Sequence, residues 1–152
     1  MNEQKIITSN SEQQTEEIAA RIGDALCGGE VIELVSDVGG GKTTFVRGLA
    51  RGIESPDAVA SPTFTIARTY ESPRYTLQHF DFYRLYDTEL IEHELEDCLG
   101  ETDQIVVVEW ADSIQHTLPE KRIRIFIRKT GDTARELKIE APKKLAYSIE
   151  KL

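Results

Sequence analysis

The sequence predicts an α/β fold of three layers, in which helices flank a mixed, partly parallel sheet that includes a terminal β-hairpin. Two short β-branched runs, at residues 31–35 and 105–108, are continuous, which is typical of strands buried on both faces. A glycine-rich turn joins the first run to a segment with helical spacing, as in a strand–helix unit. Residues 122–128 alternate between apolar and charged side chains, and residues 134–140 resemble their hairpin partner.

Length and composition indicate one globular domain over residues 1–152. The chain is 39% hydrophobic and 30% charged, which is too apolar for a disordered protein. Its net charge of −9 repels a phosphate backbone, so we expect no nucleic-acid binding by the chain alone. Charges interrupt every apolar window before the length of about 18 residues that a membrane span needs, and the first ten residues lack the features of a signal peptide.

The two cysteines, Cys27 and Cys98, lie far apart in the sequence and have no partner at a metal-binding spacing. Neither a zinc site nor a disulfide framework is indicated, and such cysteine usage fits a reducing compartment. We therefore expect a cytoplasmic protein with no contact to a membrane.

The first half of the chain reads as helix, strand, turn and helix. The capping box Ser11-x-x-Gln14 predicts a helix up to residue 26, which is followed by two glycines. The strand at residues 31–35 leads into the glycine-rich turn, and the second helix should end near residue 52. Residues 53–62 contain two prolines and little periodicity, which predicts a surface loop that moves with a ligand.

The second half alternates strands with an acidic helix. Residues 64–70 and 75–80 flank a turn and predict an antiparallel hairpin. Asp87 then precedes a helical pattern that ends at Gly100. The buried run at residues 105–108 follows and ends in an acidic residue and the single tryptophan.

The glycine-rich turn carries the strongest chemical signal in the chain. Glycines there let successive backbone N–H groups wrap an anion, and the following helix adds its N-terminal dipole. The Gly-Lys-Thr-Thr sequence after a buried strand predicts a phosphate site of the P-loop type. Lys42 would contact the β- and γ-phosphates, and Thr43 would ligate Mg²⁺. The predicted phosphate-binding residues are Val38, Gly39, Gly40, Gly41, Lys42, Thr43 and Thr44.

Ser36 departs from this pattern, which has glycine six residues before Lys42. A β-region backbone at Ser36 would make the substitution harmless. A left-handed backbone would cost about 1 kcal/mol and loosen nucleotide binding.

A P-loop nucleotidase also needs an acid at a strand end that binds Mg²⁺ and a group that orients the attacking water. Glu109 and Asp81 each end a predicted strand, and we prefer Glu109 as the metal ligand while either remains open. Thr63, at the end of the predicted loop, is a candidate switch residue that senses Mg²⁺ and the γ-phosphate, or else an ordinary turn threonine. His79 has no metal-ligand spacing and is expected only to line the site.

The sequence favours ATP over GTP. It contains no Asn-Lys-x-Asp reader of guanine, and Arg84 occupies the place three residues after Asp81 where a GTPase would carry glycine. A small-molecule kinase would need an acceptor pocket and a lid, for which 152 residues leave little chain.

The chain combines the P-loop with three further motifs in order: Ser-Pro-Thr-Phe at residues 61–64, His-Phe-Asp-Phe-Tyr-Arg-Leu at residues 79–85 and Val-Glu-Trp at residues 108–110. Over residues 9–140 this combination resembles the TsaE family, bacterial ATPases of tRNA threonylcarbamoyladenosine biosynthesis. The resemblance implies a three-layer P-loop NTPase fold and ATP with Mg²⁺ as cofactors. It also implies action on the TsaD and TsaB proteins, so that tRNA is reached only through their complex.

The resemblance also assigns residues. The family's phosphate-binding loop falls on residues 38–44, and its acidic strand ends match Asp81 and Glu109. Its N-terminal segment approaches the base, which places Glu12 and Thr15 near adenine. The catalytic residues are therefore expected to be Lys42, Asp81 and Glu109. The rival hypothesis is an adaptor that senses ATP and docks on its partner without turnover.

Overall fold

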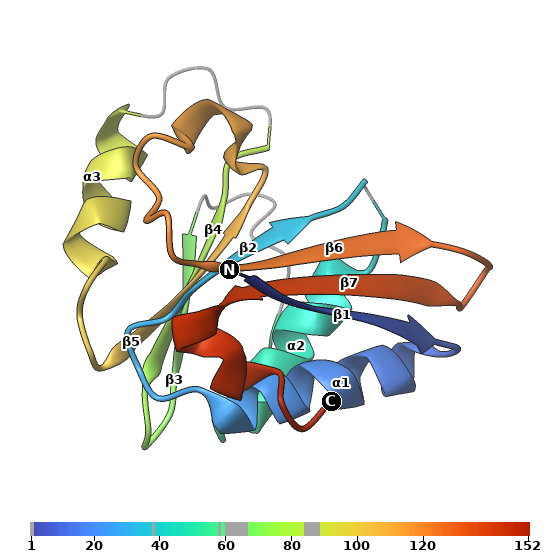
Figure 1. The fold of residues 1–152 in the computed structure, drawn as a ribbon. Helices are drawn as coiled ribbons and strands as arrows, with labels where there is room; N and C mark the ends of the chain where they lie inside the picture. The colour runs from blue at the N-terminus through green and yellow to red at the C-terminus, as the bar shows by residue number, and fades with distance from the viewer. Residues whose placement is uncertain (1, 38, 58, 60–66, 84–88) are drawn as a thin grey trace.

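A computed structural model describes residues 2–37, 39–57, 59, 67–83 and 89–152, and its backbone forms one seven-stranded sheet. The strands lie in the order β1-β7-β6-β2-β5-β4-β3. Helices cover both faces of the sheet (Figure 1), so the predicted three-layer α/β architecture is confirmed. The strands are β1 (Asn2–Ser9), β2 (Val31–Val35), β3 (Ala67–Glu71), β4 (Thr76–Asp81), β5 (Gln104–Glu109), β6 (Ile123–Lys129) and β7 (Arg135–Pro142).

The centre of the sheet is parallel and its edges are antiparallel. Strand β2 pairs in parallel with both β5 and β6, and β5 pairs in parallel with β4. At the edges, β3 pairs with β4 and β7 pairs with β1 and β6, all antiparallel. Strands β1, β6, β2, β5 and β4 therefore point the same way, and their carboxyl ends meet at one edge of the sheet, which we call the carboxyl edge. The predicted mixed sheet and C-terminal hairpin are confirmed.

The α-helices are α1 (Glu12–Ala25), α2 (Lys42–Gly52) and α3 (Glu89–Cys98), and short 3-10 helices η1 (Ala111–Ile114) and η2 (Lys143–Ser148) complete the chain. Helices α1 and α2 bury one face of the sheet, whereas α3 and η1 cover β4 and β5 on the other (Figure 1). The predicted cap of α1 is confirmed, since the Ser11 side chain accepts a hydrogen bond from the Gln14 N–H at 3.0 Å. Within the described ranges, no helix has the length and apolar character that crossing a bilayer requires.

Glycines bring α1 and α2 into close contact. A Cβ atom added at Gly48 would lie 2.3 Å from the Glu16 carbonyl oxygen, and one at Gly52 would lie 2.2 Å from that of Ala20. Glycine inside a helix costs about 1 kcal/mol relative to alanine. Here the missing side chains let the two backbones touch, which fixes α2 and the loop before it against the rest of the fold.

Strand β1 was missed by the sequence analysis, which considered the first ten residues only as a possible leader. Its sequence is polar, and Ile6 is 60% exposed, so neither alternation nor a buried run marks it as a strand. The backbone pairing from Asn2 to Ser9 with β7 defines it. Parts of other predicted elements, including Asp87 and residues 64–66, lie outside the described residues.

A buried carboxylate ties β2 to the C-terminal half of the chain. Glu33 is only 3% exposed, and its Oε1 accepts hydrogen bonds from the Nε atoms of Arg122 at 3.0 Å and Arg124 at 2.9 Å. Its Oε2 accepts from the Gln115 side-chain amide at 2.6 Å. Burial by itself raises the pKa of Glu33, but the hydrogen bonds and positive charges of these partners outweigh it, so the net pKa is lowered from 4.5.

This network should make the fold sensitive to acid. Because the pKa of Glu33 is lower in the folded chain, its contribution to stability is complete above pH 4.5 and is lost as the pH falls below that value. We expect Glu33→Gln to lower the free energy of unfolding by about 1–3 kcal/mol at pH 7, because it removes a charged hydrogen-bond partner. Urea denaturation should show that the difference in unfolding free energy from the unsubstituted protein narrows as the pH falls below 4.5.

Glu136→Gln is the matched control, because Glu136 pairs with Arg128 at the surface and should contribute less than about 1 kcal/mol. A Glu33→Gln difference that stays constant with pH would contradict the role of this network in acid sensitivity.

Candidate nucleotide site

The glycine-rich loop and the two predicted acidic residues meet at the carboxyl edge of the sheet. The glycine-rich loop, residues 36–41, follows β2, while Asp81 and Glu109 are the last residues of β4 and β5. Asp81 lies opposite Glu109 in the parallel pairing, and Glu109 lies opposite Leu34 of β2. Three strand ends thus bring the loop and the two carboxylates together, as the sequence analysis expected for a P-loop protein.

The glycine-rich loop needs glycine at two positions where the backbone is left-handed. Gly39 has a φ of 77° and Gly41 a φ of 104°, values that side chains with a Cβ rarely adopt. Gly41 is also the N-cap of α2, so the loop runs directly into the helix. Val38, the first of the predicted phosphate-binding residues, lies outside the described residues.

Ser36 does not strain this loop. Its φ is not positive, so the left-handed alternative raised by the missing glycine is wrong, and serine fits the backbone there. Its hydroxyl donates a hydrogen bond to the Asp37 carbonyl oxygen at 3.1 Å. A Cβ atom at Gly40 would lie 1.6 Å from this hydroxyl oxygen, so a side chain there would displace the Ser36 hydroxyl from its present position.

Lys42, the first residue of α2, turns its ammonium group back into the loop. Its Nζ donates hydrogen bonds to the carbonyl oxygens of Ser36 at 3.2 Å and Asp37 at 3.0 Å. The same nitrogen lies 4.6 Å from the centre of the Trp110 ring, a cation–π contact. The side chain is buried, and in the described part of the chain it makes no ion pair with a carboxylate.

The charge on Lys42 is costly where it lies. Burial lowers the pKa of its ammonium group, and the negative charges of Glu109, Asp81 and Asp37 act against that effect. A buried cation that bonds only to neutral carbonyls is suited to a ligand with stronger negative charge, such as a phosphate.

The two threonines after Lys42 lie in the first turn of α2. Thr43 is half-buried and Thr44 is buried. Both therefore lie where the N–H groups of the helix start are without intrahelical acceptors, next to Lys42.

The Asp81 carboxyl group lies beside Glu109 in surroundings that disfavour its ionisation. Burial raises the pKa of Asp81, and the adjacent negative charge of Glu109 raises it further. A hydrogen bond from the Tyr83 N–H, 2.9 Å from Oδ1, and the proximity of His79 have the opposite effect. Glu109 is only 3% exposed. A cation placed between the two side chains would relieve their repulsion.

His79 lies next to Glu109, and its role in lining the site stays a prediction. It is fully buried, with its Nε2 3.5 Å from Oε2 of Glu109, and in the described ranges neither ring nitrogen has a hydrogen-bond partner. The imidazole therefore contacts the Glu109 carboxylate from within the buried interior.

Trp110 contacts both the apolar cluster under α3 and the Lys42 ammonium group. Strand alternation predicts that the Trp110 side chain leaves β5 on the face opposite to Glu109. This is confirmed, because Trp110 packs against the apolar cluster under α3. Its φ of 55° ends the strand in a left-handed turn, and the ring then lies under the Lys42 ammonium and 4.8 Å from the ring of Tyr83. The contact with Tyr83 was not predicted.

Glu12 and Thr15, expected near adenine, lie at the start of α1, which follows the carboxyl end of β1. Glu12 is exposed, whereas Thr15 is 2% exposed and its hydroxyl lies 2.6 Å from that of Ser9. Their role toward a base stays a prediction. Thr63, the candidate switch residue, lies outside the described residues.

Sequence reasoning missed Arg135, the first residue of β7. Its Nε donates a hydrogen bond to the Gly40 carbonyl oxygen at 2.9 Å. No sequence pattern indicates its contact with the loop, because Arg135 is one of several charged residues on a strand with alternating polarity. Only the pairing of β7 with β6 brings it to the loop.

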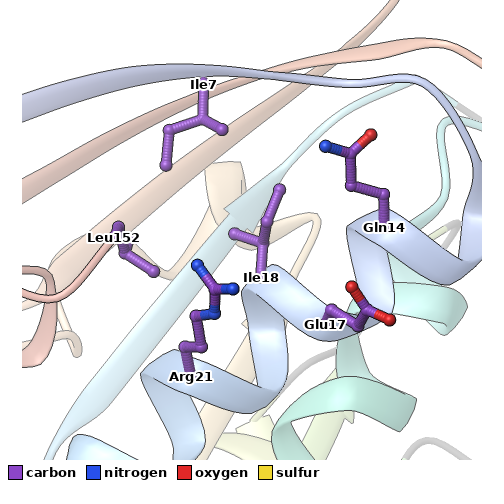
Figure 2. A pocket seen from close by; sticks show the side chains of 6 residues that line it. All are labelled: Ile7, Gln14, Glu17, Ile18, Arg21 and Leu152. Carbon is purple, nitrogen blue, oxygen red and sulfur yellow. The ribbon is translucent and has the colours of Figure 1, made fainter.

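A separate small cavity of about 140 Å³ lies between β1, α1 and the C-terminus (Figure 2). Ile7, Ile18 and Leu152 form its apolar part, and polar side chains of α1 surround them. None of the loop residues or carboxylates lines it, so it is not part of the candidate nucleotide site. No cluster of three or more His, Cys, Asp or Glu that could hold a metal occurs within the described residues.

Known proteins share both the sequence and the fold. The family model for threonylcarbamoyl adenosine biosynthesis protein TsaE matches residues 9–137. The tRNA threonylcarbamoyladenosine biosynthesis protein TsaE of Bacillus subtilis (strain 168) is 40% identical over 118 residues, which cover 74% of this chain and 70% of that protein. The protein of the same name from Treponema pallidum (strain Nichols) is 35% identical over 132 residues, covering 86% and 96%.

The crystal structure of YdiB from Bacillus subtilis matches the structure of this chain with a TM-score of 0.81 and 29% sequence identity. The match covers 99% of this chain and 95% of YdiB, so it includes both the sheet and the glycine-rich loop. Together with the family model, which spans the loop and both acidic strand ends, it shows that the chain belongs to the TsaE family.

Proposed function

We propose that this chain is an ATP-binding and ATP-hydrolysing switch subunit of tRNA threonylcarbamoyladenosine biosynthesis. In this proposal it works in the cytoplasm on the complex of TsaD and TsaB, and tRNA is reached only through that complex. One observation supports it most strongly. The buried Lys42 ammonium, the glycine-rich loop and the carboxylates of Asp81 and Glu109 share the carboxyl edge of the sheet.

Phosphate binding follows from the contacts of Lys42. Its Nζ now bonds to two loop carbonyls, and phosphate oxygens would replace these with charge-assisted hydrogen bonds. The left-handed glycines and the start of α2 supply backbone N–H groups for the same anion. Lysine and loop together suit the β- and γ-phosphates of ATP.

The acidic pair suits Mg²⁺, which characteristically takes one or two carboxylates together with substrate phosphates. When bound, Mg²⁺ neutralises the charge that develops on the transferred phosphoryl group. Glu109 and the Thr43 hydroxyl would hold the ion, while Asp81, the less buried acid, would orient the attacking water. The raised pKa of Asp81 fits a site whose cation arrives with the substrate.

The partner assignment rests on the family and on charge. Members of the family are named for threonylcarbamoyladenosine biosynthesis in tRNA, yet this chain carries a net charge of −9. Such a chain repels nucleic acid. A protein complex that itself holds tRNA is therefore the partner this chain requires.

Partner-dependent turnover is the first test. Phosphate release from ATP and Mg²⁺ should be slow for the purified chain and rise at least tenfold when the TsaD–TsaB pair is added, because the partner completes the switch. The pair without this chain is the control. Binding of ATP with no turnover under any of these conditions would instead identify a nucleotide-sensing adaptor.

Substitutions should separate binding from chemistry. Lys42→Ala removes the ammonium group that bonds to the loop carbonyls, so calorimetry should show ATP affinity reduced at least a hundredfold. Glu109→Gln keeps the shape of the side chain but not its charge, so it should retain ATP while losing Mg²⁺-dependent turnover.

Lys144→Ala is the control for the first substitution, since Lys144 is an exposed residue of η2, and it should bind ATP normally. Equal loss of binding in Lys42→Ala and Glu109→Gln would contradict the separate roles of these residues.

The single tryptophan should report nucleotide binding. Lys42 Nζ lies 4.6 Å from the centre of the Trp110 ring, and phosphates that attract the ammonium would remove this contact. ATP and Mg²⁺ should therefore change Trp110 emission saturably, and Lys42→Ala should show no such change. If calorimetry records ATP binding while emission stays flat, Glu109 and Trp110 are not at the nucleotide, and the metal role passes to Asp81.

A further inference from the structure

We infer that Arg135 is a positioning residue of the nucleotide site, which fixes the orientation of the Gly40–Gly41 peptide and adds a second positive charge beside the loop. This inference rests on the proposed nucleotide binding and extends it to a strand that the predicted motifs do not include. Arg135 is 95 residues away from Gly40 in the sequence, and the hydrogen bond from its Nε is a link between the C-terminal hairpin and the glycine-rich loop.

The side chain of Arg135 is held by three backbone carbonyls. Its Nε donates to Gly40 at 2.9 Å, and its Nη1 donates to Gly131 at 3.2 Å and to Ala134 at 2.8 Å. The two Nη1 bonds anchor the guanidinium to the turn between β6 and β7. Because the guanidinium group is planar and rigid, these bonds also fix the position of Nε beside the loop.

Arg135 has no acidic partner among the residues that the structure describes. Several other arginines pair with a carboxylate, including Arg51, Arg74, Arg122 and Arg128. Half-buried Arg135 makes no ion pair in the described part of the chain and bonds only to carbonyl oxygens. Its full positive charge therefore remains available beside the loop, where it stabilises a bound phosphate anion.

The bond to Gly40 also sets the direction of an N–H group. In a planar trans peptide the carbonyl of Gly40 and the N–H of Gly41 point in opposite directions. Arg135 draws the carbonyl toward the hairpin, which turns the Gly41 N–H the other way. Gly41 is the N-cap of α2, so its N–H joins those of the helix start that bind anions.

The topology explains why a residue of β7 reaches the loop. Strand β6 ends at the carboxyl edge, so the turn that follows it and the start of β7 lie at that edge. In the pairing of β7 with β1, Arg135 lies opposite Ser9, and the Thr133 hydroxyl donates to the Asn10 carbonyl oxygen at 3.0 Å. The turn thus contacts both the loop and the approach to α1.

Binding of the fluorescent nucleotide mant-ADP to the full chain tests the inference without partner or turnover. Arg135→Met removes the donor and the charge and should weaken binding about tenfold, the size of one lost charge-assisted hydrogen bond. Arg135→Lys keeps the positive charge but not the planar guanidinium group, so its affinity for mant-ADP should lie between those of Arg135→Met and the unsubstituted chain. Arg128→Met, on the same hairpin, removes a surface ion pair with Glu136 and should bind normally.

Amide NMR of the nucleotide-free protein separates positioning from general stability. Arg135→Met should shift the Gly41 amide resonance, because the hydrogen bond on the same peptide is lost, whereas Arg128→Met should leave it in place. Thermal denaturation of each variant shows whether it is folded. If Arg135→Met does not fold, the Arg135→Lys variant decides by the same two measurements.

The outcomes distinguish this inference from the proposed function. Normal mant-ADP affinity in Arg135→Met, together with lost binding in Lys42→Ala, would overturn the inference and leave nucleotide binding standing. An unmoved Gly41 amide in a folded Arg135 variant would overturn it as well. Failure of the unsubstituted chain to bind mant-ADP would overturn the proposed function and the inference with it.

Discussion

The buried ammonium group of Lys42 is the charge around which the carboxyl edge of the sheet is arranged. It bonds to two carbonyls of the glycine-rich loop, rests on the ring of Trp110 and faces the negative charges of Asp81 and Glu109. None of these contacts neutralises the ammonium charge, since no carboxylate within the described residues forms an ion pair with it. The folded chain can therefore bury this ammonium group, and a bound phosphate would still give the group stronger, charge-assisted hydrogen bonds.

The rest of the fold fixes the groups around this charge. Parallel pairing places Glu109 beside Asp81, and the glycine contacts between α1 and α2 fix the helix that carries Lys42. The C-terminal hairpin contributes through Arg135, which holds the outer side of the loop. The parallel strands, the helices and the C-terminal hairpin therefore contribute different parts of one candidate site.

Local patterns in the sequence predicted most of this architecture. The buried β-branched runs, the Ser11 cap and the glycine-rich turn each depend on neighbouring residues, so the elements they mark could be found without the structure. Strand β1 could not, because its polar sequence is held by pairing with β7 rather than by a buried face. Arg135 could not either, since its role follows from a register that joins distant segments.

A crystal structure with Mg²⁺ and a non-hydrolysable ATP analogue is the most direct measurement of what the chain binds and where. We expect the Lys42 Nζ to leave the carbonyl oxygens of Ser36 and Asp37 and to bond to phosphate oxygens in the glycine-rich loop. The metal should lie between the Thr43 hydroxyl and the acidic strand ends. A nucleotide bound elsewhere, with Lys42 still hydrogen-bonded to the loop carbonyls, would contradict the proposed site.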